Sequence, residues 1–172
     1  MIENYLKALI KDYPNFPKDG ILFKDLMPIL ANPEVYKLLI EKMANSSVCQ
    51  CAENIIAIDA RGFLFASAVG LSIGKPVILA RKPGKLPGEL IEESYELEYG
   101  KNTLCIQKEA LLNRDNFVII DDLLATGGTV NCISNILNKE SKKIIGLSVV
   151  VELLALNGRN KLNMQVDSIV KY

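Results

Sequence analysis

Short apolar runs alternate with helical patterns along most of this chain, and this alternation restricts the fold more than any other feature. Runs as long as a buried strand lie at residues 55–58, 77–80, 104–106, 118–120, 144–151 and 166–170. Apolar residues recur at helical spacing between several of them, at 33–44, 64–73 and 129–138. Strands that alternate with helices form parallel sheets with crossover helices. The sequence therefore predicts an α/β fold with an open, mainly parallel sheet flanked by helices, in a single domain, residues 1–172.

The stretch VIIDDLLATGGTV, residues 118–130, joins one of these strands to a helix in an unusual way. Two carboxylates, Asp121 and Asp122, follow the apolar run, and a loop of small residues then leads to a helix that begins at Thr129. Backbone N–H groups of such a loop, at the N-terminus of a helix, favour a phosphate. The aspartates would repel a phosphate and instead suit hydroxyls, a metal or a developing positive charge. A phosphorylated sugar satisfies both halves of the motif.

Two rival phosphate motifs do not match this stretch. A Walker loop needs a Lys beside its last Gly, whereas Gly127 and Gly128 are followed by Thr129 and Val130. The three spaced glycines of the dinucleotide fingerprint are also absent. A plain strand-to-helix turn, with Gly present for geometry alone, is the remaining alternative.

Charged residues follow two further predicted strands. Arg61 comes after the run 55–58, and Arg81 and Lys82 come after the run 77–80. Because ligands of open α/β sheets bind at the carboxyl ends of the strands, we expect these cations to face Asp121 and Asp122 across one crevice. Such a crevice suits a polyanionic sugar derivative, although each charge taken alone could also be a solvated loop end.

Composition excludes several functional classes. Lys plus Arg number 20 and Asp plus Glu number 20, so no net field attracts nucleic acid or an anionic membrane. The N-terminus reads as an amphipathic helix rather than a signal peptide, and the longest uncharged stretch, 62–74, is shorter than the roughly 20 residues of a membrane span. We expect a soluble cytoplasmic protein that binds neither nucleic acid nor membrane.

The residues available for catalysis are limited, because the chain has no histidine. Histidine triads and histidine zinc sites are excluded, and acid/base chemistry falls to carboxylates, Lys, Tyr or Cys. Four scattered cysteines are expected to be reduced, and the pair Cys49 and Cys51 is a weak zinc pattern without a second pair.

The segment 81–94, RKPGKLPGELIEES, breaks both periodicities with two prolines and two glycines. Long irregular segments inside compact domains are often lids or binding loops, so we interpret it as a lid. The following SYELEYG, residues 94–100, alternates apolar and acidic residues. It could complete the lid or form a hairpin strand with one solvent-exposed face.

Several of these blocks resemble one family. The segment VIIDDLLATGGT resembles the phosphoribosyl pyrophosphate (PRPP) motif of type I phosphoribosyltransferases. Four further blocks resemble the adenine phosphoribosyltransferase branch: NFPKDGILFKDLMPIL (15–30), DARGFLFASA (59–68), RKPGKLPGE (81–89) and SYELEYG (94–100). The stretch VELLALNGRNKL, 151–162, is similar to the C-terminal block of that family.

The resemblance implies that adenine and PRPP react to give AMP and pyrophosphate, with Mg²⁺ as cofactor. Its implied catalytic residues are Glu98, near N7 of the base, and Asp121 and Asp122, at the ribose hydroxyls. The implied PRPP- or AMP-binding residues are Arg61, Arg81, Lys82, Lys85, Tyr99, Asp121, Asp122, Ala125, Thr126, Gly127, Gly128 and Thr129. The implied adenine-binding residues are Leu22, Phe23, Lys24 and Leu123, with the base between Phe23 and Leu123.

The resemblance also implies the surroundings of the site. Mg²⁺ would be held mainly by PRPP, or through water by Asp121 or Asp122. Residues 1–32 would form a base-binding hood, residues 81–100 a flexible lid, and two copies a homodimer. Lys24 stands where the family more often has Arg, and a Lys cannot make the planar two-pronged contact of a guanidinium. Another purine base as substrate, or a regulator that senses PRPP without catalysis, are the alternatives.

Overall fold

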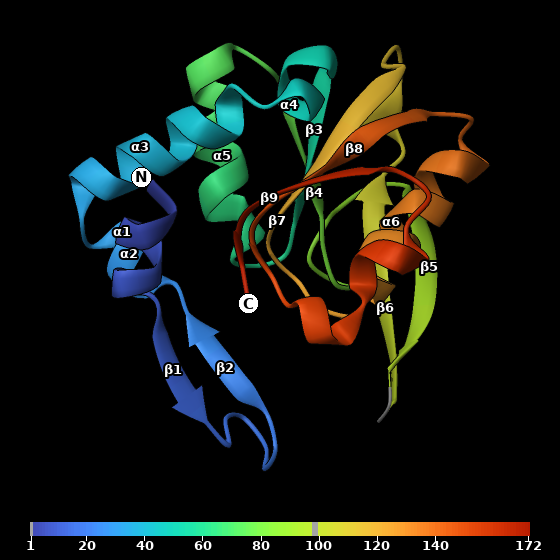
Figure 1. Cartoon of the computed structure of the whole chain (residues 1–172). Helices are drawn as coiled ribbons and strands as arrows, with labels where there is room; N and C mark the ends of the chain where they lie inside the picture. Colours follow the sequence, from blue (N-terminus) through green and yellow to red (C-terminus); the bar gives the residue numbers. More distant parts are fainter. Residues whose placement is uncertain (1, 98–99) are drawn as a thin grey trace.

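A five-stranded parallel sheet forms the centre of the protein, as the alternating pattern predicts (Figure 1). The computed structural model describes residues 2–97 and 100–172. The strand order is β4-β3-β7-β8-β9, and each neighbouring pair is parallel. The strands are β3 (Asn54–Ile58), β4 (Val77–Ala80), β7 (Asn116–Leu124), β8 (Lys143–Glu152) and β9 (Gln165–Lys171).

Helices cover both faces of this sheet. On one face lie α3 (Pro33–Ala44), whose bounds the sequence predicts, α4 (Ser47–Cys51) and α5 (Gly62–Ile73). On the other face lies α6 (Gly128–Lys139). Successive strand side chains point to opposite faces, so Val118 and Ile120 join the α3 and α5 core while Phe117 and Ile119 join the α6 core. The buried strands are thus apolar on both sides, which is why they read as continuous apolar runs.

The N-terminal segment forms a small unit beside the sheet. It contains α1 (Ile2–Leu9), β1 (Lys11–Pro14), β2 (Leu22–Asp25) and α2 (Met27–Leu30). The strands β1 and β2 pair as an antiparallel hairpin, which projects away from the body of the protein in Figure 1. Leu6, Leu26 and Ile29 are fully buried and attach this unit to the core around α3.

The run 104–106 is not a strand of the parallel sheet, contrary to the expectation from the alternating pattern. It lies in β6 (Gly100–Gln107), which pairs antiparallel with β5 (Leu90–Leu97) in a separate hairpin that packs on α6. A parallel connection needs a crossover, usually a helix, and residues 82–89 contain none. The hairpin alternative for residues 94–100 is therefore confirmed for the residues that the structure describes, 94–97 and 100.

The strand β7 is longer than the sequence indicates. We expected it to end at Ile120, but it continues through both aspartates to Leu124. The reason is its long neighbour β8, which pairs with β7 as far as Leu124 and Glu152, whereas pairing with β3 stops at Ile120. One edge of β7 is thereby left open beside the residues that follow β3.

Three connecting segments are short 3₁₀ helices: η1 (Glu109–Leu111), η2 (Leu154–Leu156) and η3 (Gly158–Lys161). All four cysteines are free, as expected. Among the described residues, no helix has both the length and the apolar character needed to cross a bilayer.

Candidate active site

The open edge of β7 lies at the point where the direction of the strand order reverses. From β3 the chain passes through α5 to β4 on one side, and from β7 it passes through α6 to β8 on the other. Ligands of open α/β sheets bind in the crevice at such a switch point. Arg61, Asp121, Asp122 and the small-residue loop 125–128 all lie there.

Arg61 and Asp122 form an ion pair across this crevice, as we expected from the strand ends. Nη2 of Arg61 lies 2.6 Å from Oδ2 of Asp122. The contact does not have hydrogen-bond geometry, so this buried oxygen has an ionic partner but no hydrogen-bond donor. The same guanidinium lies 4.8 Å from the ring centroid of Phe23, so Arg61 connects the N-terminal hairpin to the carboxylates.

The side chain of Asp121 on β7 is buried. Its Oδ1 accepts a hydrogen bond of 2.8 Å from the backbone N–H of Asp122. Burial, followed by the neighbouring Asp122 carboxylate, holds the pKa of Asp121 well above its usual range. Burial and Asp122 make the ionised form of Asp121 unfavourable, so a positive charge that develops beside this carboxylate stabilises it strongly.

Gly62, the first residue of α5, lets the Arg61 loop approach Asp121 closely. A Cβ at Gly62 would lie 2.8 Å from Oδ1 of Asp121 and 3.1 Å from the carbonyl oxygen of Ile120. Any side chain at this position would displace the carboxylate or the loop. This requirement was not predicted from the sequence, because a helical glycine gives no local sign of which strand it faces.

The loop that joins β7 to α6 forms a small cavity. The cavity has a volume of about 60 Å³ and is lined by Asp121 and residues 123–130. Gly127 has φ +84°, a left-handed conformation that favours glycine, and α6 begins at the next residue. The cavity is lined by Ala125, Thr126, Gly127, Gly128 and Thr129 at a helix N-terminus, where backbone amides favour a phosphate, and the binding roles of these residues stay predictions.

Tyr95 of β5 covers the helix side of this loop. Its hydroxyl lies 3.2 Å from Oγ1 of Thr129, and a Cβ at Gly128 would lie 3.3 Å from its ring. Tyr95 was not among the expected site residues. The alternation of SYELEYG could have indicated a buried face there, but not that this face meets α6.

The two expected adenine contacts lie in different cavities. Leu123 lines the loop cavity, whereas Phe23 lines a cavity of about 200 Å³ together with Tyr13, Phe16 and Asp25 of the hairpin. Leu22 is exposed on the same hairpin. The position of the base between Phe23 and Leu123 therefore stays a prediction.

The side chain of Lys24 turns away from the crevice. Its Nζ lies 2.7 Å from Oδ1 of Asp12 and 3.7 Å from the ring centroid of Tyr172. Only its backbone faces the site, where the carbonyl oxygen lies 3.5 Å from Nη1 of Arg61. Lys24 thus attaches the hairpin to Tyr172, the residue that follows β9.

The cations that follow β4 do not reach the aspartates of β7. Nε of Arg81 donates to Oδ2 of Asp59 at 3.1 Å, and its guanidinium lies 5.4 Å from the ring centroid of Phe63. The reason is the strand order: β3 separates β4 from β7, so Arg81 meets the carboxylate that follows β3. Lys82 and Lys85 are exposed in the segment 82–89.

Glu98 and Tyr99 lie outside the described residues. Their assigned roles stay predictions. Residues 97 and 100, which flank them in the sequence, belong to β5 and β6.

A divalent cation fits this site only if the substrate supplies most of its ligands. Within residues 2–97 and 100–172, no three His, Cys, Asp or Glu side chains are grouped to hold a metal. Mg²⁺ is commonly bound by one or two carboxylates together with substrate phosphates and water. Asp121 and Asp122, with one carboxylate oxygen free of hydrogen bonds, are compatible with that arrangement.

Known proteins match the chain over its whole length. The phosphoribosyl transferase domain family model matches residues 29–170. An adenine phosphoribosyltransferase of Prochlorococcus marinus (strain MIT 9215) is 55% identical over 172 residues, all of both chains. The chain belongs to the adenine phosphoribosyltransferase family.

Solved structures of this family have the same fold. The adenine phosphoribosyltransferase of Thermoanaerobacter pseudethanolicus is 37% identical, with a TM-score of 0.94 and full coverage of both chains. The enzyme of Giardia lamblia, solved with 9-deazaadenine, is 31% identical, with a TM-score of 0.93 over 100% of this chain and 98% of that one. The family resemblance inferred from the motifs and the α/β fold class are both confirmed.

Proposed function

We propose that this member of the adenine phosphoribosyltransferase family transfers the 5-phosphoribosyl group of PRPP to N9 of adenine, giving AMP and pyrophosphate. The curated relatives carry the name of this activity at up to 57% identity. The observation that supports it most directly is a buried carboxylate, Asp121, in the same cavity as an amide-lined loop at a helix N-terminus. A phosphorylated sugar needs both groups, the amides for its phosphate and the carboxylate for its ring.

The loop 125–129 would hold the 5′-phosphate. Its backbone N–H groups and the positive end of the α6 dipole favour two negative charges without any basic side chain. Thr126 and Thr129 can add hydroxyl donors. Because these groups are fixed before the substrate arrives, little reorganisation is needed on binding.

Asp121 and Asp122 would act on the ribose. Breaking the anomeric bond to pyrophosphate gives the ribose oxocarbenium character, and fixed carboxylates stabilise that positive charge. The charge also relieves the penalty that burial and Asp122 impose on the Asp121 carboxylate. The interaction is therefore stronger in the transition state than in the ground state, as catalysis requires.

Arg61 would exchange partners during binding. In the ligand-free site it neutralises Asp122. A guanidinium binds phosphate in the same two-pronged way as carboxylate, so Arg61 can turn to the pyrophosphate group and leave Asp122 to the ribose hydroxyls. Arg81, Lys82 and Lys85 would add positive charge from the neighbouring loop.

Mg²⁺, carried mainly by PRPP, would neutralise charge on the pyrophosphate as a Lewis acid. Asp121 or Asp122 would meet it through water. Glu98 would accept the proton that adenine loses, near N7, as N9 forms its bond to the ribose, a task that falls to a carboxylate because the chain has no histidine.

Two mobile covers are part of this proposal. Residues 1–32 would form the hood over the base, and residues 81–100 a lid that excludes water from the reactive ribose. The ribbon supports this arrangement, since the β1–β2 and β5–β6 hairpins both extend beyond the central sheet on the same side (Figure 1).

We further propose a cytoplasmic homodimer. Free cysteines suit a reducing compartment. Leu38 on α3 and Leu64 and Leu71 on α5 are exposed on neighbouring helices, and a second copy could bury them. Analytical ultracentrifugation would give twice the monomer mass if this is right, and the mass of one chain if it is wrong.

A panel of bases tests the proposed activity. Purified protein would be supplied with PRPP, Mg²⁺ and adenine, hypoxanthine, guanine or xanthine in turn. Formation of AMP alone supports the proposal, and faster turnover of another base would move the chain to another purine substrate. PRPP binding without turnover of any base would indicate a sensor.

A further inference from the structure

The block 151–162 has no role in the chemistry above, yet part of it lies directly behind the phosphate loop. Gly158 is buried, and a Cβ at this position would overlap the carbonyl oxygen of Ala125 and lie 3.1 Å from the backbone nitrogen of Gly127. In the other direction, a Cβ at Gly127 would lie 3.0 Å from the carbonyl oxygen of Gly158. The two backbone segments are therefore in contact, with no side chain between them.

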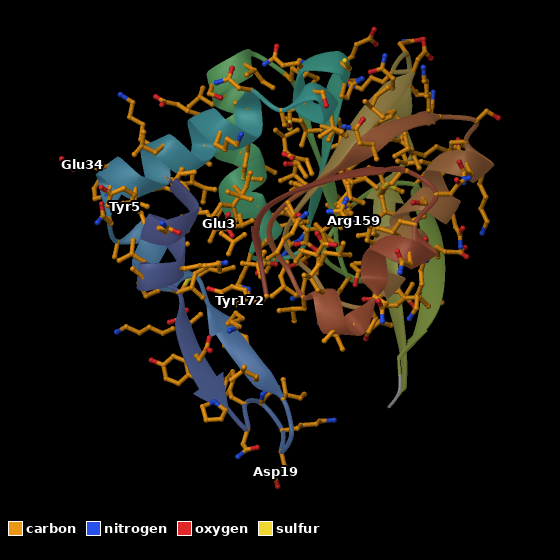
Figure 2. The ribbon with its side chains drawn as sticks, in the orientation of Figure 1. Glu3, Tyr5, Asp19, Glu34, Arg159 and Tyr172 are labelled. Atoms are coloured by element: carbon orange, nitrogen blue, oxygen red, sulfur yellow. The ribbon has the colours of Figure 1, made fainter. Side chains whose placement is uncertain are left out.

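Arg159, the next residue, is fixed by four contacts. Its Nε donates to Oε1 of Glu152 at 2.8 Å and its Nη2 to Oε2 at 2.5 Å, a two-pronged pair. Its Nη1 donates to the carbonyl oxygen of Val166 at 2.7 Å, and Nη2 also donates to Oγ of Ser168. Glu152 is only 3% exposed, and Figure 2 shows the partly exposed Arg159 beside the β8 and β9 ribbons.

Other contacts connect the same block to both ends of the loop. The N–H of Leu153 donates to the carbonyl oxygen of Leu124, where β7 ends. Nδ2 of Asn131, in the first turn of α6, donates to the carbonyl oxygen of Lys161. The block thus contacts the last residue of β7, the loop itself and the first turn of α6.

A loop of Ala, Thr and Gly cannot fix itself in this way. Small residues have few side-chain atoms to pack, and glycine has the most backbone freedom to lose. Amides that stabilise an anion act best when they are held in place beforehand. The support must therefore come from a neighbouring rigid segment.

We infer that Gly158, held by the Arg159–Glu152–Ser168 contacts, is a positioning residue that fixes the 5′-phosphate loop from behind. This inference rests on the proposed function, because it names the ligand of the loop as the phosphate of PRPP. The missing side chain sets the distance between the segments, and the Arg159 contacts keep the segment from moving away. Neither residue lines the loop cavity itself.

Two variants and one control test this inference. Gly158→Ala pushes the loop forward, and Arg159→Met removes the contacts while keeping an apolar stem. Lys75→Met is the matched control. Lys75 lies just before β4, at the opposite end of the sheet, and its Nζ donates to the backbone carbonyls of Cys49 and Gln50. All three variants should lose stability, so thermal melting cannot separate them.

The Michaelis constants separate them. A misplacement of about 1 Å can cost roughly 10²-fold, so we expect KM for PRPP to rise about tenfold or more in Gly158→Ala and Arg159→Met. KM for adenine should change less than about twofold, because most of the expected base contacts, Leu22, Phe23 and Lys24, lie on the β1–β2 hairpin away from the loop. Lys75→Met should leave both values unchanged. Arg159→Lys, which keeps the charge without the fork, should lie between wild type and Arg159→Met.

Calorimetry with ribose 5-phosphate makes the test independent of turnover. We expect affinity to fall about tenfold in Arg159→Met and not in Lys75→Met, even if Gly158→Ala does not fold. Unchanged KM and affinity in folded Arg159→Met, or an equal rise of KM for both substrates, would overturn the inference. A wild-type protein that binds ribose 5-phosphate but turns over no base would instead overturn the proposed function.

Discussion

Asp121 combines a cost to folding with a proposed gain in catalysis, and the substitution Asp121→Asn separates the two. Asn has nearly the same shape, and its Oδ1 can still accept the hydrogen bond from the N–H of Asp122. It removes only the negative charge. Because burial and Asp122 raise the pKa of Asp121, the folded state resists this charge more than the unfolded state does.

The direction of the stability change follows from linkage. A carboxyl whose folded pKa is raised contributes stability that is fully present below the unfolded pKa, about 3.9, and lost as pH rises through the folded pKa. Each pKa unit corresponds to about 1.4 kcal/mol. We therefore expect Asp121→Asn to raise the free energy of unfolding at pH 7 above that of wild type, and each 1 kcal/mol of this gain would appear as roughly 2–4 °C in Tm for a chain of this size.

The catalytic effect should have the opposite sign. Loss of the charge that stabilises the oxocarbenium ribose should lower kcat tenfold or more, which is about 1.4 kcal/mol. Urea unfolding of both proteins between pH 4 and 8, with AMP formation measured at pH 7, tests both effects. The stabilities of the two proteins should converge at the acid end. A variant less stable than wild type at pH 7, or one with wild-type kcat, would refute the reasoning.

Four further changes have defined outcomes. Gly62→Ala should lower kcat/KM about tenfold or more, because its Cβ would displace the Asp121 carboxylate or the Arg61 loop, and wild-type kinetics would contradict the close approach. The pKa of Glu152 is lowered mainly by its hydrogen bonds from Arg159, so its stabilisation is present above the unfolded pKa of about 4.3 and lost as pH falls through the folded pKa. Glu152→Gln should therefore unfold more easily at pH 7 and approach wild type in acid, as followed by circular dichroism. Glu98→Gln should lower kcat far more than it raises KM for PRPP in steady-state assays, and an unchanged kcat would remove Glu98 from the mechanism. Tyr95→Phe should raise KM for PRPP by less than about fivefold, since one hydrogen bond contributes roughly 0.5–1.5 kcal/mol; a larger rise would give the hydroxyl a direct role.

The local motifs were predictable because their causes lie within a few residues. The helix 33–44 follows from helical spacing after Asn32, whose side chain caps it by accepting from the N–H of Val35. The phosphate loop follows from small residues placed before a helix. In each case the backbone geometry depends on neighbours in the sequence, so composition and spacing were enough.

The end of β7 and the strand partner of residues 104–106 were not predictable in this way. The end of β7 depends on how far β8 runs beside it. The run in β6 pairs with β5 because the preceding segment has no crossover helix. Both depend on which strand becomes a neighbour, and apolar pattern alone does not specify a partner.

The sequence by itself determined the fold class, the family and the presence of an acidic pair beside a phosphate loop, because these follow from local periodicity and a contiguous motif. Only the tertiary structure decided which groups meet at that motif. It paired Arg81 with Asp59, turned Lys24 toward Tyr172, and placed Tyr95 and Gly158 against the loop. These contacts join residues far apart in the chain, and their geometry depends on strand order and packing rather than on any local pattern.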